Sequence, residues 1–131
     1  MDRARCVMSS QVITIHDDAT LGEAIATLLK HKISGMPVVD DQQRLIGIIS
    51  EFQLLEAVYT PAIKRDYVRD AMTEDVMTVA EDASLSEIAT LFVLHRIRRI
   101  PVVRGDKVVG IVTRRDLLRN VAETEQLAAK A

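Results

Sequence analysis

Two stretches of this chain place a hydroxyl residue three positions before an amide or an acid. They read Gly47-Ile-Ile-Ser-Glu-Phe-Gln53 and Gly110-Ile-Val-Thr-Arg-Arg-Asp116, and each belongs to a short apolar run. This spacing is a capping box, in which the hydroxyl and the third residue satisfy free backbone groups at the start of a helix. The same geometry suits ligand binding, because a helix N-terminus attracts phosphates and other anions.

The last residue of the two stretches differs, since it is Gln53 in the first and Asp116 in the second. A carboxylate in the first turn of a helix can accept hydrogen bonds from both hydroxyls of a ribose. An amide has a single accepting oxygen and no charge, so it caps the helix but binds a diol less well. We therefore expect Thr113 and Asp116 to form the stronger binding site, and Ser50 and Gln53 the weaker one.

No other constellation in the sequence indicates catalysis. The motifs of zinc hydrolases, phosphate-binding loops, nucleophile elbows and dinucleotide folds are all missing. His16, His31 and His95 lack the spacing of metal ligands. His31 and His95 fall near the ends of predicted helices, where a cation interacts well with the helix dipole. We expect no enzyme, no catalytic residue, no metal site and no cofactor beyond a regulatory nucleotide.

Composition narrows the class of protein further. The net charge is -2 and aromatic residues make up 3% of the chain, which disfavours a nucleic-acid binder. The N-terminus has no signal-peptide core, and no apolar run reaches the roughly 20 residues that span a bilayer. The single cysteine, Cys6, excludes an internal disulfide framework. We expect a soluble, cytoplasmic protein that binds neither nucleic acid nor membrane.

The sequence repeats itself at one fixed offset. A shift of 64 positions aligns Met8 with Met72 and Pro37-Val38-Val39 with Pro101-Val102-Val103. After this segment the shift becomes 63, so that Gly47 aligns with Gly110, because one turn is a residue longer. A fixed offset indicates two copies of one supersecondary unit.

Each copy predicts the same order of elements. A short strand leads to a helix that starts at a capping box, and a hairpin and a second helix follow. Glycine inside the second hairpin strand, at Gly47 and Gly110, marks close approach of another backbone or a ligand. The predicted elements are strands Val12 to Ile15 and Val76 to Val79; helices capped at Thr20 and Ser84; hairpins Met36 to Val39 with Leu45 to Ile49 and Ile100 to Val103 with Val108 to Val112; and helices Phe52 to Val58 and Leu117 to about Ala122.

This order resembles the cystathionine β-synthase (CBS) domain pair, also called a Bateman module. The resemblance rests on the lead-ins Val7-Met8-Ser9 and Ala71-Met72-Thr73, on the segments PVVD and PVVR, and on the two closing stretches. It implies an α/β fold with tandem β-α-β-β-α repeats packed about a pseudo-twofold axis, and disc-like homodimers. The domains would be repeat one at 1–60, a linker at 61–68, repeat two at 69–124 and a polar tail at 125–131.

The resemblance also implies two clefts for adenosine-containing ligands such as AMP, ADP, ATP, S-adenosylmethionine or NAD. Each cleft would take the hydroxyl and acid of one repeat together with flanking residues of the other. Carried over by position, the first cleft comprises Thr113, Asp116, Ile13, Ile33 and Ser34, and the second, weak or empty, comprises Ser50, Gln53, Met77 and Ile97.

Arginines add positive charge beside the first cleft only. Arg98 and Arg99 stand where family members often contact phosphate, whereas their counterparts in repeat one are Ser34 and Gly35. Arg114 and Arg115 lie in the first turn of the last helix and oppose its dipole. Cations in that place are easier to understand if they meet a ligand phosphate or an acidic partner, although solvated arginine is the alternative.

These observations favour a regulatory module that senses an adenosine-containing ligand and signals through self-association or a regulated protein partner. The rival hypothesis is a constitutive oligomerisation or scaffold protein, in which the clefts are vestigial and Thr113 and Asp116 form only a cap. A binder of DNA or RNA is a third hypothesis, which the charge balance and the scarcity of aromatic residues oppose.

Overall fold

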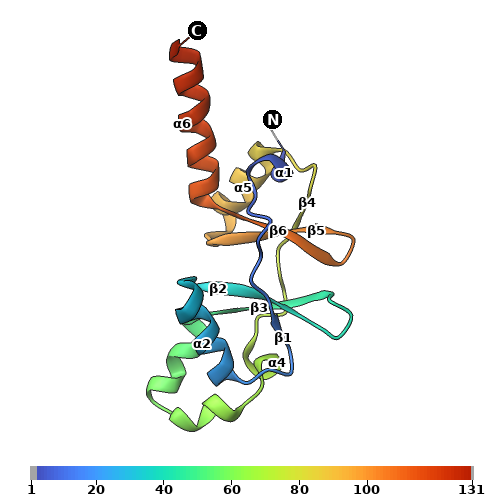
Figure 1. The fold of residues 1–131 in the computed structure, drawn as a ribbon, viewed down its shortest axis with the longest axis vertical. Helices are drawn as coiled ribbons and strands as arrows, with labels where there is room; N and C mark the ends of the chain where they lie inside the picture. The colour runs from blue at the N-terminus through green and yellow to red at the C-terminus, as the bar shows by residue number, and fades with distance from the viewer. Residues whose placement is uncertain (1–2, 131) are drawn as a thin grey trace. The chain divides into compact units, whose positions relative to one another are not determined.

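The computed structural model describes residues 3–130, and the side chains of residues 3–124. The chain divides into two compact units (Figure 1). Unit A is Ile13–Val76, and unit B combines the residues up to Val12 with those from Met77 onward. Each unit therefore contains the main part of one sequence repeat and the lead-in segment of the other.

Unit A is a three-stranded sheet covered by helices. The strand order is β1-β2-β3, with β1 parallel and β3 antiparallel to the central strand β2. The helices of this unit lie on one side of β2 and β3 (Figure 1). The elements are β1 Ile15–His16, α2 Leu21–His31, β2 Gly35–Val39, β3 Leu45–Ser50, α3 Glu51–Leu54, the 3-10 helices η1 Leu55–Val58 and η2 Pro61–Arg65, and α4 Val68–Ala71.

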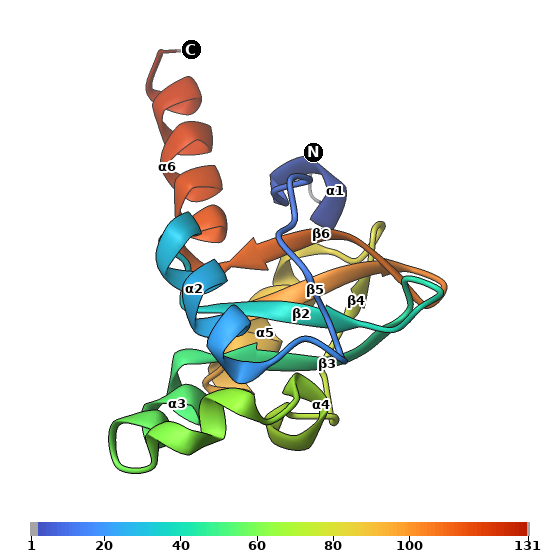
Figure 2. The ribbon, with the colours of Figure 1, turned by 60° about the horizontal axis from the view of Figure 1, so that its bottom comes forward.

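Unit B repeats this arrangement with the strand order β4-β5-β6. The register also repeats, because a shift between Val38 and Val39 of β2 recurs between Val102 and Val103 of β5. The predicted α/β fold with tandem repeats is thus confirmed. The elements are α1 Ala4–Val7, β4 Val79–Ala80, α5 Leu85–His95, β5 Arg99–Arg104, β6 Lys107–Thr113 and α6 Arg114–Lys130, which extends beyond the other elements of its unit (Figures 1 and 2).

The lead-in segments complete the sheets of the units that contain them. In unit B, Ser9 and Ile111 exchange two backbone hydrogen bonds of 2.9 and 3.0 Å. In unit A, Thr73 and Ile48 do the same at 2.8 and 2.9 Å. Each last strand, β3 or β6, is therefore paired on both sides, and the segment that pairs its outer edge comes from the other repeat.

The close approach predicted at the two strand glycines is made by methionines of these lead-ins. A Cβ added to Gly47 would lie 2.6 Å from the sulfur of Met72 and 3.0 Å from the carbonyl oxygen of Thr73. A Cβ on Gly110 would lie 2.8 Å from Cγ of Met8. Glycine is needed at both positions because any side chain would displace the methionine that packs there.

The first helix of each repeat begins at its predicted capping box. The backbone N–H of Glu23 donates to Thr20 Oγ1 at 3.1 Å, and that of Glu87 donates to Ser84 Oγ at 3.2 Å. The helices end at His31 and His95, both exposed, as predicted. Placement at a helix C-terminus fits the expected interaction of a cation with the helix dipole.

The first strands are shorter than predicted, and they start later. The structure has β1 at Ile15–His16 and β4 at Val79–Ala80, so the predicted starts at Val12 and Val76 were wrong. β1 pairs only with Val38 and Val39 of β2. The preceding residue of β2 is Pro37, which has no N–H for a ladder, and this explains why pairing does not continue further upstream.

The closing helices also differ from their predicted ranges. Because Ser50 and Thr113 are cap residues, α3 and α6 start directly after them, one and three residues earlier than predicted, respectively. Pro61 disfavours helical backbone at the residue before it. The helix α3 ends at Leu54, and the 3-10 helix η1 follows it. No proline or glycine interrupts α6, which passes the predicted end near Ala122 and continues to Lys130.

The segment expected to be a linker, residues 61–68, is tied to unit A. It contains η2, and its backbone meets the start of α2, where the N–H of Leu21 donates to the carbonyl of Asp66 at 2.8 Å. The N–H of Val68 donates to the carbonyl of Ala19 at 2.8 Å. The backbone of residues 125–130 continues α6, and their side chains, like residue 131, lie outside the described part of the chain.

Gly110→Ala is expected to lower the free energy of unfolding by about 1–3 kcal/mol, because the added methyl group overpacks the contact with Met8. Met8→Ala removes the opposing side chain, so the double variant should lose less stability than the sum of the two single variants. Urea denaturation of the wild type and the three variants measures this coupling. Strictly additive losses would show that Met8 does not set the need for glycine.

Candidate functional site

The junction of β6 with α6 is closed by a reciprocal set of hydrogen bonds between Thr113 and Asp116. Asp116 Oδ2 accepts from the backbone N–H of Thr113 at 2.7 Å and from its hydroxyl at 3.0 Å. The N–H of Asp116 lies 3.3 Å from Thr113 Oγ1. The predicted capping box is present, and it fixes one carboxylate oxygen of a side chain that is 15% exposed.

The second oxygen of this carboxylate has a different partner. Arg119 Nη1 lies 3.1 Å from Asp116 Oδ1, and the arginine side chain is 61% exposed. A carboxylate offers about four acceptor positions, of which three are used here. Oδ1 therefore retains acceptor capacity, and it gains more when the exposed guanidinium moves away.

The junction of β3 with α3 has the same frame but a different chemistry. Gln53 Oε1 accepts from the backbone N–H of Ser50 at 2.8 Å and from its hydroxyl at 2.5 Å. The amide nitrogen of Gln53 donates to Thr73 Oγ1 at 2.7 Å. The single carbonyl oxygen thus already accepts two hydrogen bonds, so Gln53 keeps the cap but has no acceptor left for a diol.

The predicted basic residues of the first cleft all belong to unit B. Arg99 is the register partner of Thr113 across β5 and β6, so its backbone lies beside the cap. Arg98 directly precedes β5, and Arg115 is exposed in the first turn of α6. The structure thus places one predicted arginine directly opposite the cap residue Thr113.

The remaining predicted residues of each cleft belong to the other unit. Ile13, Ile33 and Ser34 are half-buried residues of unit A, whereas Thr113 and Asp116 lie in unit B. Met77 and Ile97 lie in unit B, whereas Ser50 and Gln53 lie in unit A. The joint clefts implied by the resemblance therefore remain predictions.

Two contacts of the caps were not anticipated from the sequence. Arg119 follows Asp116 by three positions, a spacing that places the two side chains on one helix face and was available as a signal. Thr73 lies 20 positions from Gln53 and reaches it only because the second lead-in belongs to unit A. No local sequence pattern predicts such a contact.

Outside the caps, His16 stands among carboxylates in unit A. Its Nδ1 lies 2.7 Å from Asp18 Oδ1, and its Nε2 lies 2.6 Å from Asp41 Oδ1. Desolvation lowers the pKa of His16, but the charges and hydrogen bonds of Asp18 and Asp41 raise it by more, so the net pKa is above its usual value. Within the described residues, no group of three or more His, Cys, Asp or Glu could hold a metal ion.

Comparison with known proteins assigns the family. The CBS domain model matches residues 4–60 and 68–123, so the chain belongs to the CBS domain family and contains two CBS domains. Within residues 3–130, no helix has the length and apolar composition needed to cross a bilayer.

Similar proteins include an enzyme and two CBS pairs of known structure. Inosine-5'-monophosphate dehydrogenase of Methanocaldococcus jannaschii is 38% identical over 114 residues, which are 86% of this chain but 22% of that enzyme. CBSX2 in complex with AMP aligns with a TM-score of 0.85 at 25% identity, over 95% of this chain and 99% of that one. The CBS pair of MJ0100 in complex with 5'-methylthioadenosine and S-adenosyl-L-methionine aligns with a TM-score of 0.82 at 30% identity, over 93% and 97%.

Acid is expected to stabilise the folded protein through His16. Because the pKa of His16 is raised on folding, the stabilisation is complete below its unfolded pKa of about 6.5 and is lost as the pH rises through the folded value. The difference in unfolding free energy between wild type and His16→Gln should shrink over the range that starts at the unfolded pKa of about 6.5 and extends above it. Urea denaturation across this range measures it, with His31→Gln as a control in the same unit. A constant or growing difference would contradict the assignment.

Proposed function

We propose that this chain is a regulatory module that binds an adenosine-containing ligand, such as AMP, ADP, ATP, S-adenosylmethionine or NAD, mainly through Thr113 and Asp116. The observation that carries the proposal is the unequal acceptor capacity of the two caps. Asp116 keeps a second carboxylate oxygen beyond the one that caps α6, whereas the only accepting oxygen of Gln53 is fully used.

The family supports the class of ligand. The matched structures of CBSX2 and MJ0100 hold AMP, and S-adenosylmethionine with methylthioadenosine, respectively. All three ligands carry a ribose, for which a charged diol acceptor is suited. CBS pairs are generally regulatory rather than catalytic, and we propose the same of this chain, acting in the cytoplasm.

The remaining predicted residues have defined roles in this proposal. Arg98, Arg99 and Arg115 supply positive charge for phosphate or for another anionic group of the ligand. Ile13, Ile33 and Ser34 would flank the adenine from unit A. Arg119 would leave Asp116 Oδ1 when the ribose hydroxyls arrive, since its side chain is largely exposed.

The proposal includes self-association of the chain as one way in which ligand binding is passed on as a signal. CBS pairs resembling this chain are expected to form homodimers, and a regulated protein partner is the other route for a signal. Ligand occupancy changes such an assembly only if the ligand binds two arrangements of it with different affinity.

Asp116→Gln is expected to weaken ligand binding at least about tenfold, because it removes charge-assisted hydrogen bonds to the ribose. The variant recreates the pair found at Ser50 and Gln53, so the cap and the fold should survive. Calorimetric titration with AMP, ADP, ATP, S-adenosylmethionine and NADH measures the affinity, and thermal shift checks the fold. At 100 times the dissociation constant, a ligand should add about 2.7 kcal/mol to the stability of the wild type. Equal binding by Asp116→Gln would contradict the role of Asp116 in binding the ligand, whereas no binding by the wild type would favour the scaffold hypothesis.

Gln53→Asp is the converse change and should create or strengthen a second site. The carboxylate can still cap Ser50, and the Thr73 hydroxyl can turn to donate to it. Titration should then show a higher number of ligands bound per chain than in the wild type. A number that does not change would show that the difference between Gln53 and Asp116 does not explain the asymmetry.

A further inference from the structure

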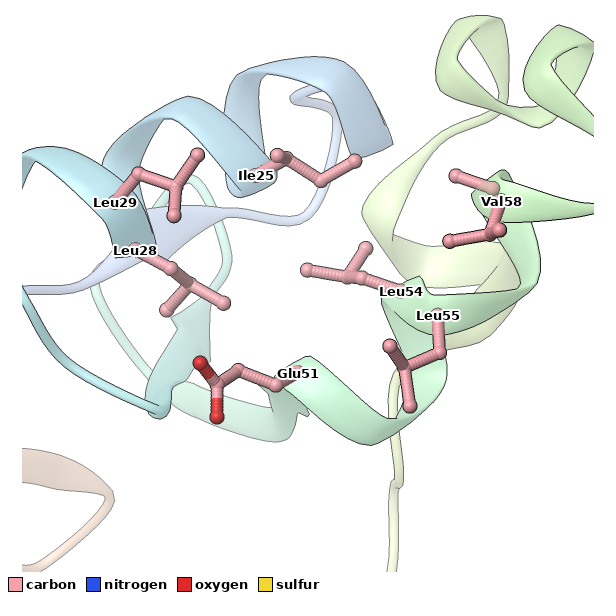
Figure 3. A pocket seen from close by; sticks show the side chains of 8 residues that line it. Ile25, Leu28, Leu29, Glu51, Leu54, Leu55 and Val58 are labelled. Carbon is pink, nitrogen blue, oxygen red and sulfur yellow. The ribbon is translucent and has the colours of Figure 1, made fainter.

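Unit A has an apolar groove between α2 on one side and α3 with η1 on the other. The groove has a volume of about 330 Å³, and seven of its eight lining residues are apolar. Figure 3 shows the side chains of α2 facing those of α3 and η1, with the carboxylate of Glu51 beside them. The lining residues are Ile25, Leu28, Leu29, Glu51, Leu54, Leu55, Ala57 and Val58.

One wall of this groove presents a stripe with a charge at its start. Glu51, Leu55 and Val58 follow one another at intervals of four and three residues, and both apolar side chains are exposed. We call these three residues the acidic stripe. Phe52 and Glu56, also exposed, flank it.

Unit B carries the corresponding stripe with the opposite charge. The equivalent positions, 63 residues later, are Arg114, Leu118 and Val121, which share one face of α6. We call them the basic stripe. Leu118 and Val121 are 67% and 59% exposed, so they lack a partner large enough to cover them within the described part of the chain.

Only the apolar positions are alike in the two stripes and their flanks. Glu51 corresponds to Arg114, Glu56 to Arg119, and the exposed Phe52 to Arg115. Each of these is an attractive pair, either of opposite charges or of a cation with an aromatic ring. Two acidic stripes facing each other would instead bring glutamates together.

We propose that the groove of unit A receives the basic stripe of unit B from a second copy of this chain. Leu118 and Val121 enter the apolar groove, and the positive charge of Arg114 is attracted by the negative charge of Glu51. This contact also accounts for Arg114, which opposes the dipole of its own helix unless it meets an acid. The proposal rests on the self-association included in the proposed function and does not require that a nucleotide binds.

Charge reversal tests the pairing. Glu51→Arg and Arg114→Glu should each weaken self-association at least about fivefold, because each faces a like charge in the other copy. The double variant Glu51→Arg/Arg114→Glu should restore it. Glu74→Arg, at an exposed residue that belongs to neither stripe, is the control for net charge. Analytical ultracentrifugation measures the dissociation constants.

The two reversals affect their own helices in opposite directions. Arginine in the first turn of α3 is unfavourable and glutamate in the first turn of α6 is favourable, so weaker association in both variants cannot come from helix stability. Single variants that associate as well as the wild type or better, or a double variant as weak as the single ones, would overturn the pairing. A wild type that is monomeric at about 100 μM would overturn self-association itself.

Cross-linking gives an independent readout. In a Cys6→Ser background, one chain carries Leu55→Cys and a second, tagged chain carries Leu118→Cys. Mixed and oxidised, they should form mainly the disulfide between the two different chains, because a disulfide requires Cα atoms within about 7 Å. Disulfides mainly between identical chains would show that like stripes meet, which leaves self-association standing but refutes this pairing. Nucleotide titration of the same proteins tests the proposed function separately.

Discussion

The pairing of each last strand with a lead-in from the other repeat is the constraint on which the rest of the structure depends. Ser9 holds β6 and Thr73 holds β3 by two backbone hydrogen bonds each. The methionine before each of them packs on Gly110 or Gly47, so the strand tolerates no side chain there. This fixes the ends of both strands, and with them the residues Thr113 and Ser50 that start the last helices. It also brings the hydroxyl of Thr73 within 2.7 Å of the Gln53 amide.

On this common frame the two caps differ in what they leave unused. Both third residues bind the backbone N–H and the hydroxyl of the cap residue through one oxygen. In Gln53 that oxygen is the only acceptor, and the nitrogen is held by Thr73. In Asp116 a second carboxylate oxygen remains, and its partner among the described residues is the guanidinium of the largely exposed Arg119 side chain. Two units of similar fold therefore present one anionic acceptor site and one neutral, saturated site. The charges of the last helices differ in the opposite sense, because Glu51 and Glu56 of repeat one correspond to Arg114 and Arg119 of repeat two.

Local signals in the sequence predicted the hairpins, the helix caps and the family, because capping boxes, polar turns and an internal repeat act over a few residues. They did not predict the contacts of the lead-ins. Thr73 was assigned to its own repeat by sequence order, although unit A contains it. The predicted starts of the first strands lie too far toward the N-terminus. Pro37, which lacks an N–H for pairing, limits β1 from the neighbouring strand β2, and the sequence of the first strand itself does not show this. The length of α6 was underestimated because its continuation carries few apolar residues, whereas the absence of proline and glycine was the better guide.

The number of adenosine-containing ligands bound by each wild-type chain tests the central claim most directly. Native mass spectrometry counts the ligands, and calorimetric titration confirms the number at saturation. The unequal caps predict one ligand per chain, whether the chains are monomers or associate. Two equivalent ligands per chain would show that the saturated amide of Gln53 binds as well as the carboxylate of Asp116, and no ligand would show that both caps are purely structural.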